Sequence, residues 1–232
     1  MMDALERLAG VGGDLLRRVD RVLIAGGAPA GDPVWELLRR VGALPGDVLE
    51  FGLKVRAEPL RVAGAQLRAD ADRFARRQGK LTVDLAGVWE GTGAEAFAVR
   101  WGALASYIGD GGDPGTITGR LRATATYAEA LADWCDALRG ELAEAVARVV
   151  SSAEAVTLRQ ADPAALREEP PAADVLEAAA RIAVRVLQPA ADAFAEAREL
   201  MARRAPDLEE LRYSEPGAGP AGGAAPTTRV AL

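Results

Sequence analysis

The sequence predicts an all-α protein, and three observations support this prediction. Apolar residues recur at alternating steps of three and four positions along most of the 232-residue chain, which is the spacing of one face of an α-helix. No segment shows the apolar–polar alternation that is typical of a β-strand. Alanine is abundant and only 5% of the residues are aromatic, a composition that favours thin helices packed closely together. We therefore expect an elongated helical bundle.

Residues 1–46 are expected to form short helices. An amphipathic pattern predicts the first helix over 3–25, with its early glycines weakening the first half. Asp32 is the predicted N-cap of a second helix, which Pro45-Gly46 should end, and Asp47 is expected to cap the next start.

Two long apolar seams follow, and they predict the longest helices. The first seam is Leu60, Gly64, Leu67, Ala71, Phe74, Gln78, Leu81, Leu85 and Val88. It resumes after a break as Ala94, Phe97, Trp101, Leu104 and Ile108, and residues 109–115 then form a glycine-rich insert. A second seam, predicted to be one helix over 116–157, is Leu121, Thr124, Ala128, Leu131, Cys135, Leu138, Leu142, Ala145 and Val149.

The break between these helices carries a Trp-x-Gly motif. Gly91 is able to adopt the positive φ that a helix end requires. Trp89 is expected to lay its indole over the end of the apolar seam. Residues 47–157 are thus predicted to form a long antiparallel helical hairpin with a Trp-x-Gly turn.

With these residues, the chain resembles the WXG superfamily of type VII (ESX) secretion. Trp89-Glu90-Gly91 lies between two seams, and Gly93-Ala94-Glu95-Ala96-Phe97 is similar to the continuation usual in that family. The lead-in from Asp32 to Leu38 is similar to longer members with extra N-terminal helices. The resemblance implies hairpins paired into four-helix bundles and export by a membrane ATPase complex without a cleaved signal peptide.

One feature departs from that family. Secreted members often carry a Tyr-x-x-x-Asp/Glu export signal, and none of Tyr107, Tyr127 and Tyr213 begins one. A partner would then supply the signal.

The remainder of the chain offers little room for a catalytic domain. Residues 158–213 are expected to hold one helix, over 172–204 with a kink at Pro189, that packs on or beside the hairpin. Residues 214–232 are rich in Gly, Pro and Ala and are expected to be a disordered tail.

Composition excludes several classes of function. The chain has no His, which rules out Ser-His-Asp triads and His-based zinc sites. We therefore expect that the protein is not an enzyme and that it binds neither a cofactor nor a metal ion. A net charge of −6 argues against nucleic acid as a partner. No apolar run is long enough for an integral membrane segment. The one cysteine, Cys135, falls on a seam and is predicted to be a buried apolar residue.

These observations predict a non-enzymatic protein–protein interaction protein of type VII secretion, as an exported or co-exported substrate, an adaptor or a chaperone. Candidate partner-contact residues are Phe97, Trp101 and Trp134, although Trp134 also suits packing inside the hairpin. The expected partner is a second WXG-type hairpin in a homo- or hetero-oligomer, with the secretion ATPase as a further candidate. Localisation would be secreted or at the cell surface. The alternative is a cytoplasmic helical protein that self-assembles and is not exported.

Overall fold

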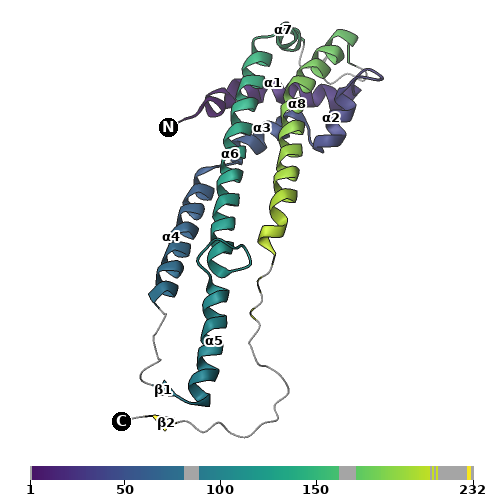
Figure 1. Ribbon diagram of the computed structural model, residues 1–232. Coiled ribbons are helices and arrows are strands. Elements are labelled where there is room, and N and C mark those ends of the chain that lie inside the picture. Colours follow the sequence, from purple (N-terminus) through teal and green to yellow (C-terminus); the bar gives the residue numbers. More distant parts are fainter. Residues whose placement is uncertain are drawn as a thin grey trace. The chain divides into compact units, whose positions relative to one another are not determined.

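The part of the chain that the structure describes is mostly α-helical, which confirms the predicted all-α class. The computed structural model describes residues 2–80, 89–161, 171–209, 211, 213 and 229–230 (Figure 1). The helices are α1 (Ala4–Gly26), α2 (Val34–Val41), α3 (Pro45–Lys54), α4 (Glu58–Lys80), α5 (Thr92–Ile108), α6 (Ile117–Val150), α7 (Ala153–Gln160) and α8 (Ala173–Arg204). A 3₁₀ turn, η2 (Ala205–Leu208), and two short strands, β1 (Trp89–Glu90) and β2 (Arg229–Val230), complete the described elements.

The chain divides into two compact units. Unit 1 comprises residues 1–58 and 130–201, and unit 2 comprises residues 59–129 and 202–232. Helix α6 therefore contributes its first part to unit 2 and its second part to unit 1. This division cuts across the segments expected from the sequence, 1–46, 47–157 and 158–213.

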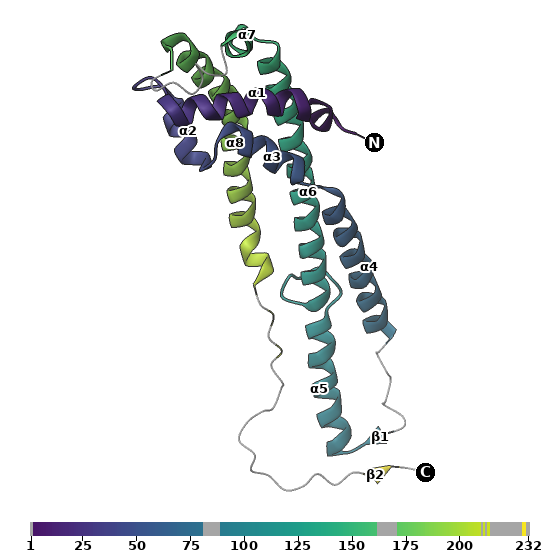
Figure 2. The ribbon, with the colours of Figure 1, turned by 180° about the vertical axis from the view of Figure 1, so that it is seen from behind.

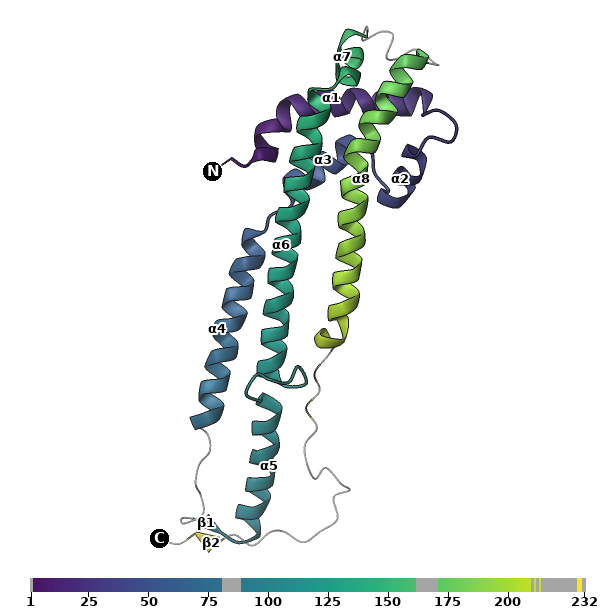
Figure 3. The same cartoon turned by 45° about the horizontal axis from the view of Figure 1, so that its top comes forward.

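Unit 1 is built on two long helices crossed by a third. Helix α8 runs beside the second part of α6, and α1 lies across both (Figures 1 and 3). Two glycines make this crossing close: Gly12 contacts Val146 of α6, and Gly26 contacts Leu176 of α8. The large side chains that unit 1 buries completely or almost so are Leu5, Leu16, Val19, Val22, Val34, Val48, Leu138, Leu142, Leu158, Ile182 and Leu187.

The helix boundaries at the N-terminal end differ in part from the predicted ones. Helix α1 begins after Asp3, whose carboxylate accepts a hydrogen bond from the Glu6 N–H, and it continues through the early glycines. Helix α2 ends at Val41, where Gly42 caps it with a φ of 72°, so the prediction that Pro45-Gly46 stops it was wrong. Pro45 instead begins α3, and Asp47 lies in its first turn, where it accepts a hydrogen bond from the Leu44 N–H.

The helix predicted over 116–157 is two helices. Helix α6 ends at Val150, and Ser152 caps α7 by accepting a hydrogen bond from the Ala155 N–H. Helix α8 closely matches the predicted 172–204, and helical structure continues through Pro189. The predicted seam is buried at Cys135, Leu138, Leu142, Ala145 and Val149.

In unit 2, α4 runs antiparallel to the first part of α6 (Figure 2). Gly64 lies against Ala125, Arg68 pairs with Glu129, and further along α4 Asp72 pairs with Arg122 at 3.1 Å. A Cβ on Gly64 would lie 3.3 Å from the Ala125 carbonyl oxygen, so the two backbones approach closely here. The connection through 81–88 lies outside the described residues, and the hairpin with a Trp-x-Gly turn stays a prediction.

The two short strands also belong to unit 2. Strands β1 and β2 pair antiparallel, with Trp89 opposite Val230 and Glu90 opposite Arg229. The sequence predicted no strand at all, and the expected disordered tail otherwise lies outside the described residues.

Candidate interaction surface

Helix α5 presents an apolar surface that unit 2 does not bury. Its 17 residues include only two charged ones, Glu95 and Arg100, and none of its residues is buried. Three of its apolar side chains are well exposed: Phe97 at 38%, Val99 at 61% and Leu104 at 37%. An exposed apolar helix of this kind is typical of a surface that contacts another protein.

Two of the three predicted partner-contact residues lie together on α5. The rings of Phe97 and Trp101 are stacked, with centroids 5.8 Å apart and planes 8° from parallel. They are one helical turn apart, so the four-residue spacing brings both rings to one side of the helix. Their stacked rings form a single broad aromatic surface on the side of α5 where Leu104 follows at the next seam position.

Trp134, the third predicted contact residue, is used inside unit 1. Its indole N–H donates a hydrogen bond to the carbonyl oxygen of Ala193 in α8, at 2.8 Å. The ring is partly buried against the apolar core of that unit. Trp134 thus packs against α8 within unit 1, whereas the sequence had suggested packing inside the hairpin or contact with another chain.

The turn motif is described only in part. Gly91 has a φ of 102° and directly precedes α5, so a side chain at this position would strain the backbone. The backbone of Trp89 lies in β1, but the placement of its indole lies outside what the structure describes. The predicted indole cap therefore remains a prediction.

The insert at 109–115 is a compact loop held by its own polar groups. The carboxylate of Asp110 accepts a hydrogen bond from the Gly112 N–H, and that of Asp113 accepts one from the Gly115 N–H. The guanidinium of Arg122 donates to the Asp110 carbonyl oxygen and also pairs with Asp72 of α4, both at 3.1 Å. The carboxylates of Asp110 and Asp113 are thus engaged in turn formation, while Arg122 of α6 contacts both the loop backbone at Asp110 and Asp72 of α4.

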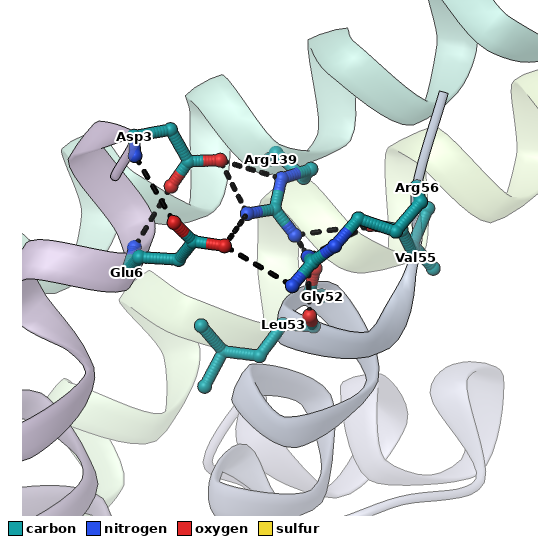
Figure 4. A network of polar contacts seen from close by, with 7 residues as sticks. All are labelled: Asp3, Glu6, Gly52, Leu53, Val55, Arg56 and Arg139. Carbon is teal, nitrogen blue, oxygen red and sulfur yellow. Dashed lines mark hydrogen bonds and ion pairs between the residues drawn. The ribbon is translucent and has the colours of Figure 1, made fainter. Parts of the chain in front are cut away.

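A buried polar network in unit 1 was not foreseen from the sequence (Figure 4). The side chain of Arg139, in α6, is only 8% exposed, and it donates to the carboxylate of Asp3. It also donates to the carbonyl oxygens of Gly52 and Val55, at 2.6 and 3.0 Å. Glu6 lies 3.6 Å from Arg139 and pairs with Arg56 at 3.1 Å.

This network joins α1, the end of α3 and α6 through one cation. Burial raises the pKa of Asp3, but the Glu6 N–H and the Arg139 guanidinium outweigh it and hold this pKa below its ordinary value of 3.8. A sequence signal was available, because Arg139 is spaced four residues from Cys135 and three from Leu142, on the buried face of α6. Because the Arg139 guanidinium is fully paired within the chain, we interpret this network as a structural clamp that holds α1, α3 and α6 together.

Comparisons with protein-family models, curated proteins and solved structures found no match for this chain. Within the described residues there is no group of three or more His, Cys, Asp or Glu side chains arranged to hold a metal ion. Among the same residues, no helix is both long and apolar enough to cross a membrane.

Proposed function

We propose that this chain is a non-enzymatic protein–protein interaction protein of type VII secretion, exported itself or together with a partner, and that unit 2 is its partner-binding part. The observation that carries the interaction role is the contrast between the two units. Unit 1 buries many Leu, Val and Ile side chains. In the described part of unit 2 the buried residues are all small: Gly64, Ala71, Gly109, Thr118, Gly119, Ala125 and Ala128.

Burial of large apolar side chains is what stabilises a helical unit. Full burial of one Leu, Val or Phe contributes about 1.5–3 kcal/mol, whereas ordering each backbone residue costs about 1–2 kcal/mol. Unit 2 orders α4, α5 and the first part of α6 around contacts between small residues, and it leaves Phe74, Phe97, Val99 and Leu104 exposed. A second protein that covers these side chains would supply the missing apolar burial.

The secretion context rests on the Trp-x-Gly motif and its flanking helices. Gly91 has the positive φ expected at this motif, and helices α4 and α5 lie on either side of it in the chain. The partner we propose is a second WXG-type helical hairpin protein that lies against α4 and α5, with the secretion ATPase as a further candidate. Because no Tyr-x-x-x-Asp/Glu signal follows the tyrosines of this chain, that partner would carry the export signal.

A matched pair of substitutions on α5 tests the interaction role. Leu104→Glu places a charge on the apolar side of the helix, and Ser106→Glu places the same charge two residues away, on the opposite side. We expect the Leu104 variant to lose co-purification with a Trp-x-Gly protein encoded beside this gene, and the Ser106 variant to retain it. Equal retention by both variants would contradict a role for α5.

Export is tested in the native host. We expect the wild-type protein in the culture supernatant or at the cell surface, and we expect that amount to fall to background when the secretion ATPase gene is deleted. Protein that stays inside cells of both strains would contradict the secretion role and favour the self-assembling alternative.

A further inference from the structure

Two described parts of the C-terminal segment contact the two ends of α5. The ring of Tyr213 lies against the ring of Tyr107, in the last turn of α5, with centroids 5.1 Å apart and planes at 57° to each other. Later in the chain, Arg229 and Val230 form β2, which pairs with β1 just before α5 begins (Figure 2). Contacts between segments far apart in the sequence thus bracket the helix that carries the exposed apolar surface.

Both contacts can form at once in one molecule. Tyr213 comes first in the chain and meets the end of α5, whereas β2 comes later and meets β1 near the start of α5. A helix of 17 residues is about 25 Å long. The chain from Tyr213 to Arg229 can reach about 50 Å when it is extended, so it is long enough to join the two contacts.

Tyr107 borders the apolar side of α5. It comes three residues after Leu104, so the two side chains are neighbours on the helix surface, and Phe97 and Trp101 continue that side toward the start of the helix. A partner helix packed along this side lies with its axis about 8–10 Å from that of α5, close enough to cover the positions beside the seam as well. The Tyr213 ring and such a partner would therefore compete for the same end of α5.

Both contacts are weak enough for a partner to displace them. Strands β1 and β2 have two residues each, and a two-stranded pairing on its own is marginally stable in water. The single aromatic pair adds a modest attraction, and Tyr213 remains 43% exposed. Contacts of this strength hold a segment in place in the free protein but yield to a larger interface.

We propose that Tyr213 and β2 form an autoinhibitory latch on α5, which the partner displaces when it binds. The apparent dissociation constant for the partner is then the intrinsic one divided by the fraction of molecules in which the latch is open. This regulation rests on the partner-binding function proposed for α5, because a latch without a competing partner has nothing to inhibit.

Two matched variants of the full chain test the latch. The open variant carries Tyr213→Ala, Arg229→Pro and Val230→Pro, which remove one ring of the aromatic pair and both backbone N–H groups of β2. The closed control carries Tyr213→Phe, Arg229→Lys and Val230→Ile, which keep the ring and the N–H groups. None of these positions lies in a described helix, so both variants should retain the far-UV helicity of the wild type.

Affinity for a Trp-x-Gly protein encoded beside this gene, measured by isothermal titration calorimetry, is the first readout. We expect the open variant to bind roughly tenfold more tightly than the wild type, and the closed control to bind as the wild type does. Equal affinities, or weaker binding by the open variant, would overturn the latch and leave the partner-binding function standing. Binding by none of the three proteins would contradict the proposed function and, with it, the latch.

Hydrogen–deuterium exchange shows whether the latch closes and opens. In the protein alone, the amides of β1 should exchange roughly tenfold faster in the open variant than in the wild type and the closed control. Adding the partner to the wild type should slow exchange in α5 and speed it in β2, because the displaced strand loses its pairing with β1. Equal exchange of β1 in all three proteins, or a β2 that stays protected in the complex, would overturn the latch.

Discussion

Replacing Arg139 with Met removes the one cation that joins α1, α3 and α6 while keeping most of its aliphatic volume. Its loss leaves the Gly52 and Val55 carbonyl oxygens without this donor, and a buried polar group left unpaired costs about 1–3 kcal/mol. Asp3 and Glu6 retain access to water, since their side chains are 44% and 28% exposed, so their loss of a counter-charge adds little. We therefore expect Arg139→Met to lower the free energy of unfolding by about 2–4 kcal/mol.

Urea unfolding followed by far-UV circular dichroism measures this change. The control is Arg148→Met, which removes an exposed pair with Glu144 and should cost less than about 0.5 kcal/mol. The pKa of Asp3 is lowered in the folded state, so its contribution is present above the ordinary pKa of 3.8 and is lost as the pH falls through the folded-state value. The difference between wild type and Arg139→Met should shrink in the same acidic range. Equal unfolding midpoints for the Arg139 and Arg148 variants would refute the clamp.

Three further changes test other parts of the account. Burial raises the pKa of Asp20 to about 6, although the hydrogen bond from the Gly46 N–H lowers it. The stability that the protonated Asp20 carboxyl provides is therefore lost as the pH rises through about 6. In urea titrations at several pH values, Asp20→Asn should raise the free energy of unfolding by about 1–2 kcal/mol at neutral pH and leave it unchanged below pH 3.8. Gly64→Leu should cost about 1–3 kcal/mol by forcing α4 away from Ala125, whereas Gly102→Ala, with open space around it, should be neutral or stabilising in thermal melts. Deleting residues 214–232 should leave far-UV helicity unchanged, and a marked loss of helicity would contradict our expectation for this tail.

The apolar periodicity of the sequence was sufficient to predict most of the helices. It located α8 to within a residue of its observed ends and gave the buried face of α6 from Cys135 to Val149. It did not predict the break at Ser151-Ser152, because the seam ends at Val149 and does not show where the helix stops, so the predicted helix over 116–157 ran across both serines. The capping signal was nevertheless present in Ser152, whose hydroxyl accepts a hydrogen bond from the Ala155 N–H.

Other features depend on contacts between distant segments, which periodicity does not report. From the sequence, the early glycines of α1 were expected only to weaken the helix. In the structure, Gly12 lies where Val146 of α6 leaves no room for a side chain. Both seams also looked alike in the sequence, although one buries Leu138 and Leu142 and the described part of the other buries only Gly64 and Ala71. Of the candidate contact residues, Phe97 and Trp101 do lie together on α5, but the hydrogen bond of Trp134 to Ala193 follows from the tertiary packing of α8.

Hydrogen–deuterium exchange of the whole chain, alone and with a candidate Trp-x-Gly partner, tests the central claim most directly. If unit 2 lacks apolar burial that a partner supplies, the amides of α4 and α5 should exchange much faster than those of α8 in the protein alone. The partner should then slow exchange in α4 and α5 while leaving α8 unchanged. Equally slow exchange in both units without a partner, or no added protection of α5 in the mixture, would contradict a partner-binding role for unit 2.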